Sequence, residues 1–135
     1  MVACRLPKEA LHPRMSGPVW MSFMRGEFDT AAFQAMKAVE VAVREAAGLG
    51  AVDIGTNLMR KAFHSDTGAL TDRSAGPAAR QALSDLFAGA IGTYKNPHSH
   101  RDVLLDDPTE AAEIVMLANH LIRIVDARAT ARRQA

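Results

Sequence analysis

PAARQALSDLFAGAIGTY, the stretch from Pro77 to Tyr94, decides the fold class. Its apolar side chains recur at positions i, i+3, i+4 and i+7, which is the spacing of one face of an α-helix. Pro77 suits the first turn of a helix, and Pro97 ends the pattern because proline cannot continue the backbone hydrogen bonds. The stretch therefore predicts one long helix whose buried face carries Leu83, Leu86, Phe87, Ala90, Ile91 and Tyr94.

Two further long helices are predicted, one on each side of this stretch in the sequence. Asp29-Thr30 offers an N-cap for a helix that runs to about Ala47 and stops at Gly48. Asp107 caps the last helix, with Pro108 at its first position and Glu110 completing a near capping box. Their apolar faces consist of Ala32, Met36, Val39, Val43 and Ala46 in the first, and of Ile114, Leu117, Leu121, Ile122 and Val125 in the second.

The remaining segments predict short helices and loops. Short helices are expected over Val19–Met24 and around Ile54–Phe63. Prolines and a glycine make Leu6–Pro18 an irregular or briefly helical lead-in, and the polar, turn-rich Ser65–Gly76 predicts a surface loop. No segment alternates in the way a half-buried strand does. The fold class is therefore predicted as all-α, an up-and-down helical bundle with about three long helices and several shorter ones.

Length and composition fit one globular domain. The chain has 135 residues, of which 48% are hydrophobic, and we expect a single domain over 1–135 with its core at about 11–126. The net charge of +1 argues against binding nucleic acid by bulk electrostatics, so any such contact would be local. The basic end of the last helix is predicted to be solvated, with its cations near the negative end of the helix dipole. Those cations are Arg123, Arg128, Arg132 and Arg133.

The expected location is the cytoplasm, with no membrane contact. The lone Cys4 cannot form an internal disulfide, and Met1–Gly17 lacks the apolar core of a signal peptide. No apolar run approaches the roughly 20 residues needed to span a bilayer.

The concentrated chemistry of the sequence follows the helix at 77–94. The segment Lys95-Asn96-Pro97-His98-Ser99-His100-Arg101 places cations, an amide and two imidazoles within seven positions. Histidine exchanges protons near neutral pH, and a cation can stabilise a phosphorane-like transition state. On spacing alone, a solvated basic loop explains the same residues. His98, His100 and Asp102 lack a distant fourth ligand, so neither a metal site nor a cofactor is predicted.

Two other patterns leave alternatives open. Gly89 and Gly92, inside a helix, indicate that another backbone comes close, from the same chain or from a partner. Lys37, Glu40 and Arg44 share one edge of the helix at 29–47. They form either an exposed salt-bridge ladder or a support for the polar segment across the bundle.

Several short motifs follow one another in order from about Leu11 to Asp126. They are Leu11-His12-Pro13, Gly26-Glu27-Phe28, Ala32-Phe33, Lys37-Ala38-Val39-Glu40, Val43-Arg44, Leu58-Met59, Ala62-Phe63, Phe87-Ala88-Gly89-Ala90, Lys95-Asn96-Pro97, His100, Glu110-Ala111, Ala118-Asn119-His120-Leu121 and Arg123. Together these motifs resemble the Ymh family, a branch of the HEPN superfamily of helical domains. Members often carry another domain upstream of the His-Pro element, so this chain resembles the C-terminal domain alone.

The resemblance implies a site and an activity. HEPN domains are common in prokaryotic toxin–antitoxin and antiviral-defence systems, and many are metal-independent endoribonucleases that act as dimers. Their signature is an arginine, a polar residue and then a histidine. In this sequence the polar residue is Asn96 and the histidine is His100, while Lys95 stands where the family usually has arginine.

By the same resemblance, His100 would transfer the proton, Lys95 would hold the scissile phosphate and Asn96 would orient the histidine or the RNA. Lysine lacks the planar two-point grip of arginine. Residues that would support the site or bind RNA are His98, Arg101, Glu40, Arg44 and Tyr94.

The expected function is thus metal-independent RNA cleavage by a homodimer, without a cofactor. A partner protein from a defence or toxin–antitoxin operon is also expected. The alternative is a catalytically inactive HEPN module that serves dimerisation, partner binding or RNA binding, in which Lys95 marks the lost activity.

Overall fold

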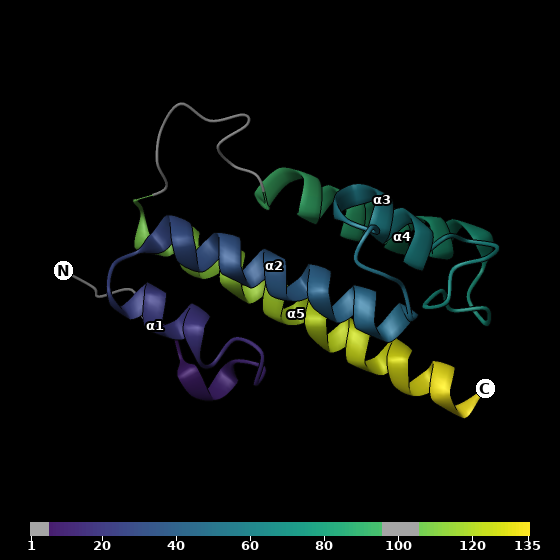
Figure 1. Cartoon of the computed structure of the whole chain (residues 1–135), viewed down its shortest axis with the longest axis horizontal. Coiled ribbons are helices and arrows are strands. Elements are labelled where there is room, and N and C mark those ends of the chain that lie inside the picture. The colour runs from purple at the N-terminus through teal and green to yellow at the C-terminus, as the bar shows by residue number, and fades with distance from the viewer. Residues whose placement is uncertain (1–5, 96–105) are drawn as a thin grey trace.

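Every regular element that the structure describes is a helix (Figure 1). The structure is a computed structural model, and it describes residues 6–95 and 106–135. The predicted all-α bundle is confirmed, since α2, α4 and α5 are the three long helices and the others are short. The elements are a 3-10 helix η1 (Lys8–Ala10), α1 (Pro18–Met24), α2 (Phe28–Ala47), α3 (Gly55–Ala62), α4 (Pro77–Tyr94) and α5 (Pro108–Gln134).

The helices are arranged around the pair α2 and α5. These two lie side by side and run in the same direction, with α3 and α4 on one side of α2 and α1 on the other (Figure 1). Arg132, near the end of α5, donates a hydrogen bond to the carbonyl oxygen of Ala46, near the end of α2, at 2.7 Å. The carboxyl ends of the two central helices are therefore joined directly.

The apolar faces predicted for the long helices meet in one buried core. Met36, Leu121 and Ile122 are fully buried where α2 faces α5. The rings of Phe63 and Phe87 stack with their centroids 4.2 Å apart, and this contact joins the end of α3 to the middle of α4. Aromatic packing thus holds α3 and α4 to each other.

The lead-in before α1 is held against α5 by polar contacts. The amide of Asn119, which is only 3% exposed, accepts a hydrogen bond from the His12 backbone N–H at 2.6 Å and donates one to the Ala10 carbonyl at 3.1 Å. The ring of His12 contacts Asp126 through Nε2 at 2.7 Å. The predicted irregular segment therefore has a fixed course, which includes the short η1.

The prediction of a solvated basic end on α5 holds for Arg123, Arg132 and Arg133, which are exposed, but not for Arg128, which is partly buried. Arg128 donates to the carbonyl oxygens of Leu70 and Thr71, each at 3.0 Å, and Arg132 donates to Ala46. These guanidinium groups satisfy backbone acceptors of other segments. Leu70 is fully buried at this contact, so the predicted surface loop at 65–76 also contributes to the core.

Three further local predictions need correction. The N-cap of α2 is Glu27 rather than Asp29-Thr30, and the Glu27 side chain makes no capping hydrogen bond. Edge-to-face packing of Phe28 on Phe23, with centroids 5.2 Å apart, fixes the chain at this earlier position. Ile54 precedes α3 and is 57% exposed, while Leu86 is 44% exposed because it lies at the edge of the α4 apolar face.

Candidate functional site

Lys95 ends α4, and its side chain reaches across the bundle to α2. Its backbone N–H donates to the Ile91 carbonyl, so the helical geometry continues to Lys95, the first residue of the polar segment 95–101. Its ammonium Nζ donates to Glu40 Oε2 at 2.6 Å. The contact joins residues 55 positions apart and fixes the point from which the chain continues to Asn96.

Three donors converge on the Glu40 carboxylate. Besides the Lys95 ammonium, Oε2 accepts the backbone N–H of Gly55 at 2.7 Å, and Oε1 lies 3.3 Å from Arg44. The side chain of Glu40 is 5% exposed, so desolvation would be costly without these partners. One buried carboxylate therefore holds together the middle of α2, the start of α3 and the end of α4.

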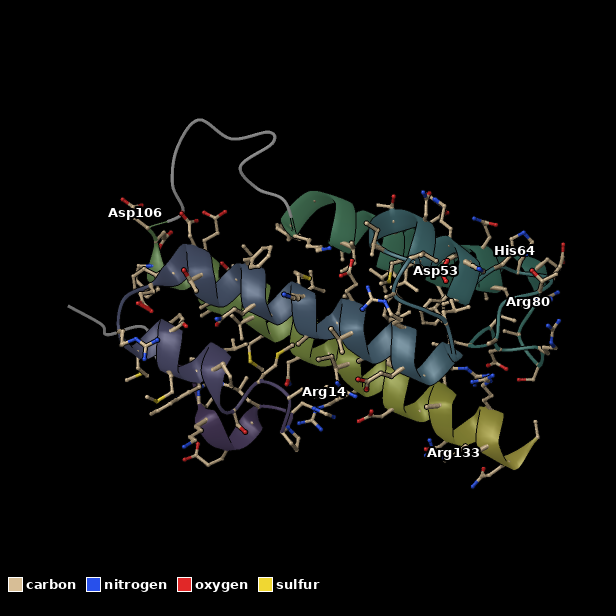
Figure 2. The ribbon with its side chains drawn as sticks, viewed as in Figure 1. Arg14, Asp53, His64, Arg80, Asp106 and Arg133 are labelled. Atoms are coloured by element: carbon tan, nitrogen blue, oxygen red, sulfur yellow. The ribbon has the colours of Figure 1, made fainter. Side chains whose placement is uncertain are left out.

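The turn before α3 is shaped by the same cluster. Arg44 Nε donates to the Asp53 carbonyl at 2.9 Å, and Lys61 reaches the Asp53 carboxylate at 3.2 Å. Gly55 adopts a left-handed backbone with φ of +62°, which lets its N–H point at Glu40. Figure 2 shows Asp53 at this turn, on the side of α2 that faces α3 and α4.

The electrostatics of the cluster favour an ionised Glu40. Burial alone raises the pKa of this carboxyl, but the hydrogen bonds from Lys95 and Gly55 and the charges of Lys95 and Arg44 outweigh it. The pKa of Glu40 therefore lies below its ordinary value of 4.5. With Lys95 and Arg44 protonated, the three side chains carry one net positive charge at the base of the polar segment.

Acid should weaken the fold through this residue. Because the pKa of Glu40 is lower in the folded state, its ionised form contributes stability above its unfolded-state pKa of about 4.5, and that stability is lost as the pH falls through the folded-state pKa. We expect the free energy of unfolding of Glu40→Gln to vary less with pH below 5 than that of the parent. Urea denaturation between pH 7 and pH 3 measures it. Glu9→Gln, at an exposed site, is the control, and equal acid slopes in parent and Glu40→Gln would contradict the expectation.

The structure brings together only part of the predicted site. Lys95, Glu40 and Arg44 meet in one cluster, and the buried Glu40 excludes the alternative of an exposed salt-bridge ladder. Tyr94 is half-buried and turns to a different face, where it meets α5. The other predicted residues lie outside the described part of the chain, namely Asn96, His98, His100 and Arg101, as does Asp102 of the metal-site alternative.

Sequence reasoning missed Gly55, Asp53 and Lys61 as members of the cluster. The signal for Gly55 was its residue type, because glycine adopts a positive φ at little steric cost. Asp53 takes part mainly through its backbone carbonyl, which leaves no trace in the sequence.

A groove runs between α4 and α5, next to the cluster. One part, of about 340 Å³, is lined by Leu86, Gly89, Tyr94 and Leu117 among others, and a second part, of about 250 Å³, extends from Tyr94 to Glu110 and Glu113. A Cβ atom at Gly89 would meet no atom within 4 Å, whereas one at Gly92 would lie 3.1 Å from the Thr56 side chain. The close approach predicted from the two glycines is therefore found within the chain at Gly92 only, and the neighbour there is a side chain rather than a backbone.

Two histidines of the described chain are committed to structural contacts. Nδ1 of His12 accepts the Arg14 backbone N–H at 3.1 Å while Nε2 contacts Asp126, so neither ring nitrogen is open to a substrate. His64 accepts the backbone N–H groups of Asp66 and Thr67 through Nδ1. Figure 2 shows His64 at the end of the molecule opposite Asp106, where α5 begins.

The part of the chain that the structure describes holds neither a metal-binding cluster nor a membrane-spanning helix. Residues 6–95 and 106–135 contain no group of three or more His, Cys, Asp and Glu side chains placed to hold a metal ion. Over the same ranges, no helix combines the length and apolarity needed to cross a membrane.

Comparison with known proteins gives one match. A family model described as a protein of unknown function, Hypoth_ymh, matches residues 9–125, which is most of the chain. Neither the curated proteins nor the solved structures include a match to the chain.

Proposed function

We propose that this chain, which belongs to the Hypoth_ymh family, is a metal-independent endoribonuclease of a prokaryotic toxin or antiviral-defence system. The site would lie around Lys95, Asn96 and His100 and would be completed by a second copy of the chain. The proposal combines the resemblance to HEPN domains with one observation, the buried cluster of Glu40, Lys95 and Arg44.

The cluster supports this function because it costs stability to build a buried charge, and it lies where the polar segment begins. A carboxylate in a helical core is neutral or unfavourable for stability compared with an apolar residue of similar size. Here it fixes the end of α4 to two other helices and leaves one net positive charge beside the segment that carries His100. Both properties suit a site that positions an anionic polymer.

The chemistry needs few groups. RNA supplies its own nucleophile, the 2′-hydroxyl, which attacks the adjacent phosphorus while the 5′-oxygen leaves. His100 would take the proton from the 2′-hydroxyl or give one to the leaving oxygen, and Asn96 would orient the imidazole or the RNA. The products would be a 2′,3′-cyclic phosphate and a free 5′-hydroxyl. This reaction requires no metal ion.

The direct test incubates the purified chain with mixed tRNA and a structured RNA in EDTA. We expect the parent to cleave and His100→Ala to be at least about 100-fold slower, the usual contribution of a general acid or base. His120→Ala, at an exposed position of α5, is the matched control and should cleave like the parent. Lys95→Arg, which introduces the usual residue of the family, should cleave at least as fast as the parent.

Equal rates for His100→Ala and the parent would refute the assigned site. If the parent, Lys95→Arg and His120→Ala are all inactive on every RNA, the result supports the second candidate function. This candidate is a non-catalytic HEPN module for dimerisation, partner binding or RNA binding. The observation in its favour is that the Lys95 ammonium is already bound by Glu40. A partner protein encoded in the same defence or toxin–antitoxin operon would then be the object of a binding assay.

The groove between α4 and α5 is the surface we propose for the homodimer. It combines the exposed Leu86, the open space at Gly89 and the partly buried Leu117. Tyr94, one residue before Lys95, lines both parts of the groove, so two copies joined here would bring their polar segments toward one interface. Small residues in a helix allow such close crossing.

A charge in this groove should separate the two copies. We expect the parent to sediment with twice the 14.5 kDa mass of one chain and Leu86→Glu to sediment as a single chain, because a carboxylate cannot be buried there without a partner. Met24→Glu is the control, since Met24 is 58% exposed on α1, on the other side of α2. A dimer that survives Leu86→Glu but not Met24→Glu would move the interface to α1.

A further inference from the structure

Lys95 occupies the position that family resemblance gives to the residue gripping the RNA phosphate, but its contacts are those of an anchor. The side chain is 18% exposed, and its ammonium lies 2.6 Å from a carboxylate that is itself 5% exposed. A phosphate ligand is ordinarily a cation whose charge is free to meet the substrate. Here a buried carboxylate offsets the charge of Lys95 before any substrate arrives.

The neighbours of Glu40 make this pairing hard to exchange. Releasing Lys95 toward an RNA phosphate would leave Glu40 with Gly55 and a longer contact of 3.3 Å to Arg44. Removing one partner of a buried ion pair is costly, because the remaining charge is left without compensation. Substrate binding would have to supply that free energy for Lys95 alone.

We propose that Lys95 is a positioning residue held by Glu40, and that this pair anchors the end of α4 without contributing charge to RNA binding. The role in cleavage rests on the proposed function, whereas the anchoring itself does not. The ion pair is electrically neutral and connects α2 to the end of α4. Phosphate contacts are then left to other residues of the site.

The RNA-free test observes the lysine directly. An ammonium held in a buried ion pair exchanges its protons slowly, so we expect a resolved side-chain ¹⁵N–H signal for Lys95 in the parent. The signal should be lost in Glu40→Gln and kept in Lys37→Met, whose lysine lies exposed one turn earlier on α2. A Lys95 signal that is absent from the parent, or that does not respond to Glu40→Gln, would overturn the proposal.

A double-variant comparison tests whether the two residues act as one unit. Lys95→Met leaves the Glu40 charge buried, and Glu40→Gln leaves Lys95 without its partner. The double variant Glu40→Gln/Lys95→Met removes both charges and should unfold at higher urea than Lys95→Met alone. If the stability losses of the two single variants simply add up in the double variant, the residues act independently, and the proposed anchoring pair is contradicted.

The RNA test separates an anchor from a phosphate ligand. For Lys95→Met we expect kcat to fall while KM stays at the parent value, with Lys95→Arg restoring kcat. The slope of log affinity against log salt concentration should be the same as in the parent. A phosphate ligand would instead raise KM and lower the magnitude of the slope by about one, and this result would overturn the proposal.

The two failures are distinguishable. If the parent neither binds nor cleaves RNA, the proposed function is wrong, and the anchoring of Lys95 is then decided by its ¹⁵N–H signal and by the double-variant comparison. If the parent cleaves RNA and Lys95→Met lowers the salt slope, the function stands and the positioning role is wrong.

Discussion

Phe87→Ala should lower the free energy of unfolding by about 3–5 kcal/mol, as large aromatic truncations in a close-packed core do. Phe87 is fully buried, and its ring stacks on that of Phe63 with an interplanar angle of 23°. Truncation removes this stack and leaves a cavity between α3 and α4. A domain of this size has a total stability of only about 5–15 kcal/mol, so the variant should unfold at markedly lower urea concentration.

An exposed apolar residue outside the proposed dimer surface supplies the control. Met21 on α1 is 47% exposed, so Met21→Ala should cost well under half as much. Equilibrium urea denaturation followed by circular dichroism measures both variants. Comparable losses for Met21→Ala and Phe87→Ala would mean that the stacked pair is not part of the stabilising core.

Among the glycine-to-alanine substitutions of this chain, Gly68→Ala should cause the largest loss of stability. An added Cβ would lie 2.4 Å from the His64 backbone nitrogen, 2.5 Å from the Ala62 carbonyl oxygen and 2.7 Å from the His64 carbonyl oxygen. All three are backbone atoms, so no side-chain rotation relieves the contact. The turn would have to open the hydrogen bond from the Leu70 N–H to Ala62 and displace the buried Leu70. We expect a loss of about 3 kcal/mol or more, at the upper end of overpacking effects.

Gly50→Ala is the control for this prediction. Its added Cβ would meet no atom within 4 Å, its φ is not positive, and alanine at such a position restricts the unfolded chain, which favours folding by up to about 1 kcal/mol. The measurement is the shift in melting temperature by calorimetry, down for Gly68→Ala and up or unchanged for Gly50→Ala. A Gly68→Ala variant that melts with the parent would show that the turn can move freely.

The sequence predicted those features of the fold that depend on neighbouring residues. Asp107 caps α5 by accepting the Thr109 N–H at 2.9 Å, and Gly48 ends α2 in the left-handed conformation, both as expected. Helix caps and apolar periodicity depend only on residues a few positions apart, so they can be recognised in the sequence. Where packing between distant segments decided the outcome, the predictions failed, as they did for the burial of Leu70 beneath Arg128.

In the candidate site, too, local features were predictable from the sequence and contacts between distant segments were not. The i, i+4 spacing of Glu40 and Arg44 is equally consistent with an exposed pair and with a buried one, because spacing on one helix carries no information about what covers it. The partner that decides between them, Lys95, is 55 positions away. The contribution of Gly55 is a backbone N–H, which every residue except proline possesses.

The docking of the lead-in onto α5 has a consequence for the order of events during folding. His12 is held by Asn119 and Asp126, which lie 107 and 114 positions further along the chain. During synthesis the lead-in therefore emerges long before the helix that binds it, and α2 likewise waits for the partner that covers its apolar face. Contacts between residues so far apart slow folding, because a long loop must close before they form. The exposed face of α2 is then the surface that a nascent chain must protect from aggregation until α5 has been made.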